Sequence, residues 1–392
     1  LNNASTKYNM EGAIGIVMNP KTGEILAMSS RPNFDPTNYQ AYSIETINRN
    51  LPIWSSYEPG STFKILTLSA ALNEGKVNLF EDTYYDTGGI KVGGSTLHCW
   101  KAGGHGFETF LEVVENSCNP GFVVLSNKLG KETLFNYIDK FGFGKKTGID
   151  LNGESKGIIF SLDKVGPLEL ATTGFGQGVS VTAIQQVTAV SAIVNNGNMY
   201  TPFVVKSISD YETGTILKET TPALKSKNLV TKETSDMVKY ALESVVANGS
   251  GHNAYIEGYR IGGKTGTAQK VGSDGKYMIG NYILSFIGFI PANDPEYVVY
   301  IAIDGAKGAT QYGGSTSAPI AKSIFNSIIS LYDLKSTTNG MPREYFWYET
   351  KYVTVPDVRG LSIKEAKTLL TGFNLEYTGS GKTVVITNPE PG

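Results

Sequence analysis

The sequence predicts an α+β fold in which helices flank an antiparallel sheet, joined to a small second α+β unit. Segments rich in β-branched and aromatic residues occur near the start of the chain and again after residue 255, and the region between them shows mainly helical periodicity. Residues 353–392 contain a helix-start signature of their own. The length of 392 residues is enough for one large domain with a small appendage.

The first predicted elements are a hairpin and a buried helix. Residues 13–28 predict two apolar strands around a turn at residues 19–23, where Pro20 fixes φ and Gly23 accepts a positive φ. A long helix is predicted from Ser61 onward, after a Pro-Gly turn, because apolar residues recur there at helical spacing. Ser61 is therefore expected to open this helix.

The middle and late parts of the chain differ in character. Glycine dominates residues 83–107, which predicts loops and short strands. Helices are predicted at residues 110–127, 134–141 and 167–194, the last interrupted by a glycine-rich stretch at 174–178. Adjacent antiparallel strands are predicted at residues 260–269, 282–290 and 296–304. A final helix at 318–332 is expected to pack on that sheet through a stripe formed by Ile320, Ile324, Ile328 and Leu331.

These elements predict a large domain at residues 1–334, a linker at 335–352 and a small unit at 353–392. The linker is polar and then aromatic. In the small unit, Ser362 and Glu365 form a capping box, in which each side chain satisfies a free backbone N–H group at a helix start. Ala366, Leu369 and Leu370 are expected to face its core.

Composition narrows the class of protein. Apolar residues make up 40% and charged residues 18%, which is typical of a folded globular protein. Lysine and arginine total 34 against 36 acidic residues without blocks of like charge, so the sequence gives no reason to expect a nucleic-acid partner. The apolar stretches fall short of the roughly 18–20 residues that a membrane-spanning helix requires.

Two Ser-x-x-Lys sequences are candidates for nucleophilic catalysis. Residues three apart on a helix share one face, so this spacing can place a lysine base beside a serine nucleophile. Ser61 and Lys64 open a long apolar helix, whereas the second copy, at Ser161 and Lys164, is followed at once by Gly-Pro. The context favours the first copy.

Two further motifs also occur more than once. Ser-x-Asn occurs at Ser117–Asn119, between helical segments, and at 226–228 in a polar stretch. Lys-Thr-Gly occurs at Lys21, Lys146 and Lys264, and only the copy at Lys264 leads into a strand that can align a peptide along its edge. The copies at Ser117 and Lys264 are therefore preferred.

In this order, residues 58–64, 115–120, 176–178 and 263–268 resemble the transpeptidase domain of class B penicillin-binding proteins, which has a serine β-lactamase/transpeptidase-like fold. The resemblance covers roughly residues 13–331. Residues 353–360 and 389–392 resemble the two ends of one PASTA module, cut off near its final strand. A single module, together with the run of residues from Cys99 to Cys118, is most similar to the stage V sporulation protein D group.

The resemblance implies a catalytic role for five residues. Ser61 is expected to be the acylated nucleophile and Lys64 its base, with a pKa lowered by burial or by a nearby positive charge such as Lys264. Ser117 is expected to relay a proton to the leaving amine, and Asn119 to hold the substrate amide. Lys264 is expected to face the substrate carboxylate.

The resemblance also implies substrate contacts around the same site. Thr265 is expected to bind the substrate carboxylate beside Lys264, with Gly266 next to it. The backbone N–H groups of Ser61 and Thr267 are expected to form the oxyanion hole. Gln177 either shapes the pocket or belongs to a purely structural turn.

The implied activity is a peptidoglycan D,D-transpeptidase that cross-links stem peptides, is acylated by β-lactams and acts in spore cortex synthesis. No hydrolytic glutamate is assignable, which favours attack on the acyl-enzyme by an amine over attack by water. The alternatives are a D,D-carboxypeptidase or β-lactamase-type hydrolase, and a non-catalytic penicillin-binding sensor or scaffold. The family also implies a membrane anchor before this chain, an extracytoplasmic catalytic domain, a glycosyltransferase partner and no required cofactor. The PASTA-like unit is expected either to bind muropeptide or to act as a spacer.

Both cysteines and two of the three histidines fall within a short stretch of the chain, at His98, Cys99, His105 and Cys118. Thiolate and imidazole ligands suit zinc, although the spacing is not that of a zinc finger. A structural zinc, a disulfide and two free thiols all remain open at this point. Because Cys118 lies between Ser117 and Asn119, a constraint on its sulfur is expected to position the candidate proton relay.

Overall fold

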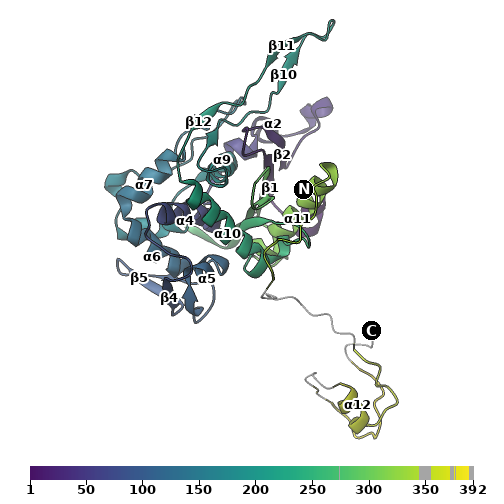
Figure 1. The fold of residues 1–392 in the computed structure, drawn as a ribbon. Helices are drawn as coiled ribbons and strands as arrows, with labels where there is room; N and C mark the ends of the chain where they lie inside the picture. The colour runs from purple at the N-terminus through teal and green to yellow at the C-terminus, as the bar shows by residue number, and fades with distance from the viewer. Residues whose placement is uncertain (273, 344–354, 371–374, 376, 388–392) are drawn as a thin grey trace. The chain divides into compact units, whose positions relative to one another are not determined.

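The computed structural model describes residues 1–272, 274–343, 355–370, 375 and 377–387. The chain divides into two compact units, Leu1–Trp347 and Tyr348–Gly392 (Figure 1). The predicted linker at residues 335–352 and the end of the predicted PASTA module fall partly outside the described residues.

A five-stranded antiparallel sheet with the order β13-β14-β15-β1-β2 forms the centre of the first unit. Its strands are β1 (Gly12–Met18), β2 (Ile25–Arg31), β13 (Gly262–Val271), β14 (Tyr277–Ile290) and β15 (Tyr297–Asp304). The predicted hairpin and the three late strands are confirmed, and they join because β1 pairs with β15, with Ile14 opposite Ala302.

One face of the sheet packs on two helices from opposite ends of the unit, α1 (Asn2–Tyr8) and α11 (Gly313–Leu331). On α11 the buried apolar positions include Phe325 and Ile328, whereas Leu331 is 75% exposed. The predicted stripe was therefore partly wrong. The helix begins five residues earlier than predicted, and Ala318, Ala321, Phe325 and Ile328 share the buried face at helical spacing.

The other face of the sheet carries the larger core, which includes Ile16, Ile287 and Val298. Helices α4 (Lys64–Asn73) and α9 (Ala183–Val194) belong to this core, and every residue of α9 is buried. A helix that the sequence analysis did not predict, α10 (Lys232–Asn248), contacts β13, α4 and α9. Figure 1 shows α4, α9 and α10 grouped beside the sheet.

The middle of the chain is mainly helical, as predicted. It contains α5 (Phe110–Glu115), α6 (Asn119–Leu129), α7 (Lys131–Lys140) and α8 (Pro167–Gly174). The single helix predicted at residues 110–127 is divided by a turn before α6. Two small ladders lie in the glycine-rich stretch: β4 (Thr83–Asp86) pairs with β7 (Gly106–Thr109), and β5 (Gly89–Val92) pairs with β6 (Ser95–His98).

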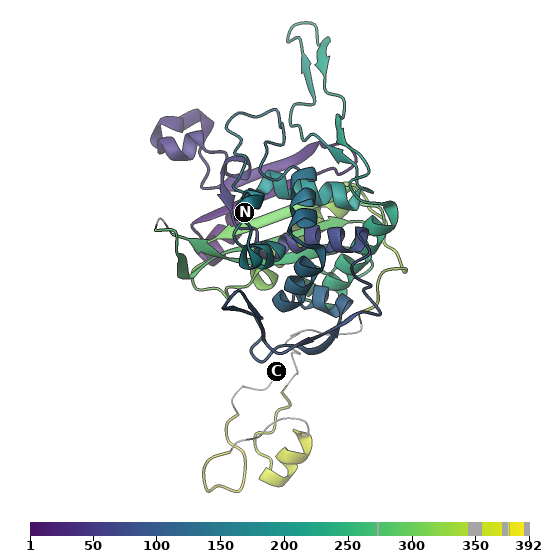
Figure 2. The ribbon, with the colours of Figure 1, turned by 90° about the vertical axis from the view of Figure 1, so that its left-hand side faces the viewer.

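Short elements complete the first unit. A third ladder of β10 (Ser207–Ser209) and β11 (Ile216–Glu219) extends away from the rest of this unit (Figures 1 and 2). The remaining elements are α2 (Ile44–Asn48), α3 (Leu51–Trp54), β3 (Ser56–Tyr57), β8 (Val181–Thr182), β9 (Met199–Tyr200), β12 (Leu224–Ser226) and the 3₁₀ turns Pro36–Ala41, Gly60–Thr62, Leu162–Lys164 and His252–Ala254.

The second unit contains one described helix, α12 (Ile363–Leu369), with Ser362 as its N-cap and the predicted capping box to Glu365. A small separate core is formed by Val358, Ala366 and Leu370. The prediction that Leu369 faces this core was wrong, because its side chain is 53% exposed. Within the described part of the chain, no helix combines the length and the apolarity that crossing a membrane requires.

Candidate active site

Ser61 lies in the 3₁₀ turn Gly60–Thr62, directly before α4. The prediction that Ser61 opens the long helix is corrected by one turn, because the α-helix itself begins at Lys64. Two hydrogen bonds hold the turn: the Gly60 N–H donates to the Gly176 carbonyl at 3.0 Å, and Thr62 Oγ1 donates to the Pro59 carbonyl at 2.9 Å. The nucleophile candidate is thus fixed at a helix start.

The glycine-rich stretch at residues 174–178 packs directly against this turn. Gly176 has a φ of 83°, and a Cβ atom there would overlap the carbonyl oxygen of Gly60. This close approach requires a residue without a side chain. Gly176 therefore has a structural role, while the adjacent Gln177 lines the cleft described below.

Lys64 joins two of the three sequence motifs. Its side chain is buried, and Nζ donates to the Ser117 carbonyl at 2.8 Å, to Asn119 Oδ1 at 2.7 Å and to Ser117 Oγ at 3.2 Å. Ser117 has a φ of 55°, a left-handed conformation that is uncommon for a residue with a side chain. Such a conformation persists where the surroundings hold it, which is frequent at functional sites.

Burial is the main cause of the shifted lysine pKa values. Desolvation lowers the pKa of Lys64 to about 7, although electrostatic interactions with Cys118, Cys99 and Glu108 act in the opposite direction. Burial, and then the positive charge of Lys64, lower the pKa of Lys264 well below its ordinary value. A substantial fraction of Lys64 is therefore neutral near pH 7, as a general base requires.

The third motif lies on β13, an edge strand of the sheet. Thr265 Oγ1 donates to Ser250 Oγ at 3.3 Å, and the Gly313 N–H at the start of α11 donates to Thr267 Oγ1 at 3.2 Å. Lys264 is 1% exposed, and its Nζ donates to the Thr265 carbonyl at 3.4 Å. The sequence analysis missed Ser250, which lies in a loop with no motif around it.

A cleft with a volume of about 370 Å³ lies where the three motifs meet. It is lined by Gly60, Ser61, Trp100, Ser117, Asn119, Phe175, Gln177, Thr265, Thr267, Tyr282, Gln311 and Tyr312. Lys64 and Lys264 are buried and do not line the cleft. Lys64 is connected to it through its hydrogen bonds to Ser117 and Asn119, which do line it. A larger cavity of about 650 Å³, between α10 and residues 336–343, contains none of the motif residues.

Four cleft residues were missing from the sequence analysis: Trp100, Tyr282, Gln311 and Tyr312. The ring of Trp100 lies 6.0 Å from that of Tyr312, and its Nε1 donates to the Asn116 carbonyl at 2.7 Å. An exposed tryptophan next to Cys99 was the available signal, because large aromatic residues in glycine-rich loops often line binding sites.

The motif copies that were set aside lie apart from the cleft. Ser161 and Lys164 are exposed; Ser161 precedes the short turn Leu162–Lys164 and Lys164 is its last residue. Lys21 forms an ion pair with Asp294 at 2.8 Å in the hairpin turn. The structure thus brings together the preferred copies of all three motifs and no other copy.

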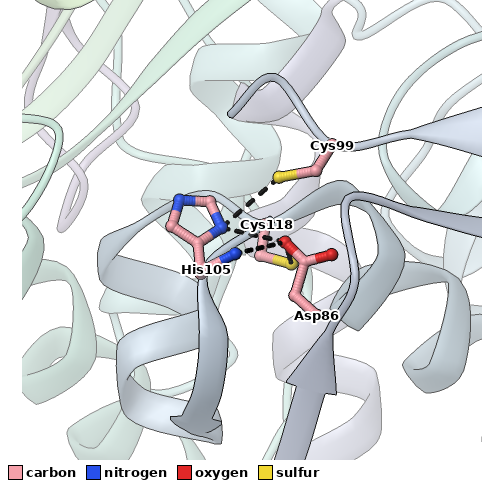
Figure 3. Close-up of side chains that lie close together, drawn as sticks. All are labelled: Asp86, Cys99, His105 and Cys118. Atoms are coloured by element: carbon pink, nitrogen blue, oxygen red, sulfur yellow. Dashed lines mark hydrogen bonds and ion pairs between the residues drawn. The ribbon is translucent and has the colours of Figure 1, made fainter. Parts of the chain in front are cut away.

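Three of the four predicted metal ligands meet beside the cleft, namely Cys99, His105 and Cys118, and Asp86 joins them (Figure 3). His98 is exposed and is not part of this group. The prediction of His98 as a ligand is corrected, because successive residues along an extended segment point to opposite sides and Cys99 points inward. The His98 carbonyl instead accepts a hydrogen bond from Asn119 Nδ2 at 3.2 Å.

Comparison with known proteins agrees with this geometry. The family described as "Penicillin binding protein transpeptidase domain" matches residues 13–326. The chain belongs to the class B penicillin-binding proteins. A PASTA domain matches residues 353–392 of this penicillin-binding protein, and the α+β fold class predicted from the sequence is confirmed.

Stage V sporulation protein D of Bacillus subtilis (strain 168) is 55% identical over 392 residues, which are all of this chain and 60% of that relative. The peptidoglycan D,D-transpeptidase FtsI of Escherichia coli (strain K12) is 29% identical over 348 residues, 88% of this chain and 56% of the relative. This penicillin-binding protein therefore spans about 60% of the length of the curated relatives that it matches.

Solved structures of penicillin-binding proteins share the fold. Penicillin-binding protein 3 of Mycobacterium tuberculosis in complex with ampicillin has a TM-score of 0.80 at 29% identity, covering 87% of this chain and 77% of that one. The transpeptidase domain of Burkholderia pseudomallei penicillin-binding protein 3 has a TM-score of 0.73 at 25% identity, covering 87% and 94%.

Proposed function

We propose that this chain carries out peptidoglycan D,D-transpeptidation through an acyl-enzyme on Ser61. One observation carries the proposal. Lys64, one turn after Ser61, is buried with a pKa of about 7 and donates to both Ser117 and Asn119. A neutral amine that lies one helical turn from a candidate nucleophile and hydrogen-bonds a candidate proton relay is what serine acyl transfer requires.

In the first step, Ser61 Oγ attacks a stem-peptide carbonyl carbon and its proton passes to the neutral Lys64 Nζ. The backbone N–H groups of Ser61 and Thr267 would stabilise the resulting oxyanion. The C–N bond then breaks, and the leaving amine takes the proton from Lys64 through the hydroxyl of Ser117. The products are a Ser61 ester and a free amine that carries the proton from Ser61, so this step needs no cofactor.

In the second step, an acceptor amine attacks the Ser61 ester and forms the new amide bond as the ester C–O bond breaks. Its proton passes through Ser117 and Lys64 to the Ser61 oxygen, which frees Ser61 and releases the cross-linked peptide. The position of β13 supports this alignment. It is an edge strand, and Thr265 and Thr267 line the cleft, so a stem peptide can lie along it as an added strand. We assign Lys264 an electrostatic role behind this surface: a substrate carboxylate near Thr265 would raise the lowered pKa of Lys264, and the resulting ammonium group would hold the carboxylate in place.

The relatives support the choice of substrate. They include proteins named peptidoglycan D,D-transpeptidase and stage V sporulation protein D, and solved neighbours contain ampicillin or aztreonam. Accordingly, we propose that β-lactams acylate Ser61 and that the reaction serves spore cortex synthesis. The substrate is extracytoplasmic, so we also propose a location at the outer side of the cell membrane, beside a glycosyltransferase that supplies the glycan strands.

Intact-mass analysis after incubation with penicillin tests the nucleophile, because the chain contains a matched control. Ser61→Ala should abolish the adduct, whereas Ser161→Ala, in the exposed second Ser-x-x-Lys, should leave its rate unchanged. An adduct that persists in Ser61→Ala, or that maps to another residue, would overturn the assignment.

A second measurement separates the transpeptidase from the alternatives. With a stem-peptide ester as donor and an amino acid as acceptor, a transpeptidase should transfer the acyl group to the amine in preference to water. Hydrolysis that is insensitive to the acceptor would indicate a carboxypeptidase or β-lactamase. Acylation by penicillin without any turnover of the ester would indicate a sensor.

A further inference from the structure

A buried carboxyl group close to the candidate nucleophile takes no part in the reaction steps above. Glu58 is 8% exposed and precedes Pro59 in the segment that leads into the 3₁₀ turn of Ser61. The Gly178 N–H donates to Glu58 Oε1 at 2.8 Å. The hydroxyl oxygen of Tyr277 is 3.1 Å from Glu58 Oε1 and 3.0 Å from Oε2. Three separate segments of the chain therefore meet at one side chain.

The Glu58 carboxyl group is buried without a neighbouring cation. Among the residues that the structure describes, its hydrogen-bond donors are the Gly178 N–H and the Tyr277 hydroxyl, and no basic side chain pairs with it. Burial raises the pKa of Glu58, and burial together with the adjacent carboxylate raises the pKa of Tyr277. Tyr277 therefore stays protonated and is the donor. A carboxyl group in such a place is unfavourable unless its oxygens accept hydrogen bonds, so both donors are needed.

Both donors belong to segments that form the wall of the cleft. Gly178 follows Gln177, which lines the cleft. Tyr277 is the first residue of β14, the strand that pairs with β13 and contributes Tyr282 to the cleft wall. Glu58 thus connects two segments of the wall to the catalytic turn.

The middle and the far end of β13 are held in different ways. The middle packs closely on the catalytic turn, because a Cβ atom on Gly266 would lie 3.1 Å from the Pro59 carbonyl oxygen. After Gln269 the register of the ladder shifts, and Val271 at the far end of β13 pairs with Tyr277. The hydroxyl of Tyr277 therefore ties this far end, through β14, to the catalytic turn.

Ion pairs hold the same end of β13 to the sheet but not to the catalytic turn. Lys270 Nζ lies 2.7 Å from Asp304 Oδ1 on β15 and 2.9 Å from Glu11 Oε2. These contacts keep the far end of β13 in place when the hydroxyl of Tyr277 is removed. Its loss should therefore change the position of the strand relative to the turn without unfolding the hairpin.

The far end of β13 is where the longer part of a peptide donor would lie. With the substrate carboxylate near Thr265 and the reacting carbonyl at the Thr267 N–H, the rest of an added strand continues toward Val271. Val271 is four residues beyond Thr267, which is about 13 Å along a β-strand. A stem peptide is long enough to reach this end, whereas penicillin carries only a short side chain beyond its reacting carbonyl.

We propose that Glu58 and Tyr277 form a clamp that fixes the far end of β13 relative to the catalytic turn and thereby favours extended peptide donors. Both are positioning residues, because they act through β13 and do not line the cleft. The place of the donor on β13 rests on the proposed function, whereas the clamp itself does not.

Tyr277→Phe is the first test, because it removes the hydroxyl and keeps a ring that is 45% exposed, so the variant should fold. Its kcat/KM for a stem-peptide ester should fall about tenfold, mainly through a higher KM, while the rate of penicillin acylation should change less than about twofold. Tyr137→Phe is the matched control: it loses a hydroxyl–carboxylate bond of 2.8 Å to Glu74, after the last residue of α4, and should change neither reaction. An equal loss with both substrates, or no loss with the peptide, would refute the clamp.

Donor binding tests the clamp without turnover. In a Ser61→Ala chain, ligand-observed NMR titration with a stem pentapeptide should give a Kd about tenfold higher when Tyr277→Phe is added. Adding Tyr277→Phe to Glu58→Leu should have no further effect, because both changes break the same contact. Additive losses, or an unchanged Kd, would contradict the proposal. A wild-type chain that reacts with penicillin but turns over no peptide ester would refute the proposed transpeptidation, and the Kd comparison would still decide on the clamp.

Discussion

The hydrogen-bond partners of Lys64 are neutral: the Ser117 carbonyl, the Ser117 hydroxyl and the amide oxygen of Asn119. No carboxylate hydrogen-bonds its ammonium group within the described structure, so burial dominates and the pKa falls. These neutral partners allow Lys64 to lose its proton and act as a base. A paired carboxylate would keep the lysine charged and remove the base.

The rate of penicillin acylation should therefore depend on pH through Lys64. We expect the rate constant to rise through an inflection near pH 7, about tenfold from pH 6 to the plateau, because only the neutral amine accepts the serine proton. The folded-state pKa of about 7 lies below the ordinary lysine value of 10.5, so the unfolded chain binds more protons between those two values. Lys64 therefore makes the unfolding free energy rise with pH in that range. Stopped-flow acylation across this range checks the inflection.

Lys64→Met provides the matching variant. Acylation should fall by about 10²–10⁴-fold and the pH inflection should disappear, with little change in melting temperature. Lys164→Met, at the exposed second Ser-x-x-Lys, should behave as wild type. An unchanged inflection in Lys64→Met would assign the titration to another group.

Single residues were predictable where the signal is local. Ser61 and Lys64 are one helical turn apart, so spacing alone relates them. Asp86 was missed because its contact with Cys118 is made across folded segments and depends on the close approach at Gly104. His98 was chosen because it adjoins Cys99, yet alternation along the strand turns it outward.

At the scale of elements, the catalytic turn depends on its contact with residues 174–178. Gly176→Ala should reduce the acylation rate more than tenfold and lower the melting temperature, because the new methyl group would displace the Gly60 carbonyl beside Ser61. Acylation kinetics and thermal unfolding of the same samples measure both effects.

Gly153→Ala is the matched control, since Gly153 has a similar φ of 85° but no atom within 4 Å of the added Cβ. It should lower the free energy of unfolding by only about 1–2 kcal/mol, the amount that a Cβ atom costs in the left-handed backbone conformation, and it should leave the acylation rate unchanged. Equal effects in the two variants would show that backbone strain, not contact with the turn, explains the loss.

Elements with strong patterns were predictable, but their pairing was not. The late strands were predicted from their alternating or continuous apolar residues. The pairing of β1 with β15 joins segments at opposite ends of the unit, and no local sequence pattern indicates it. Helix α10 was missed despite a usable signal: Thr231 caps it, and Val238, Leu242 and Val245 follow helical spacing. On α11, Ile320, Ile324 and Ile328 pack against the core as the spacing predicted, and only Leu331 lies away from it.

The whole molecule consists of two units with separate cores. All motif residues and the predicted metal ligands belong to the first unit. A chain ending at Trp347 should therefore be acylated by penicillin at a rate within about twofold of the full chain, measured on paired preparations. A tenfold loss, equivalent to about 1.4 kcal/mol, would show that the PASTA unit contributes to the active site.

The pairing of β1 with β15 also affects how the protein is made. Ile14 on β1 pairs with Ala302 on β15, so the central sheet cannot form until nearly the whole first unit has been synthesised. Until then β1, apolar on both faces, offers an unpaired edge to neighbouring chains. Such distant contacts slow folding, and the nascent chain therefore needs protection from aggregation until its last strand emerges.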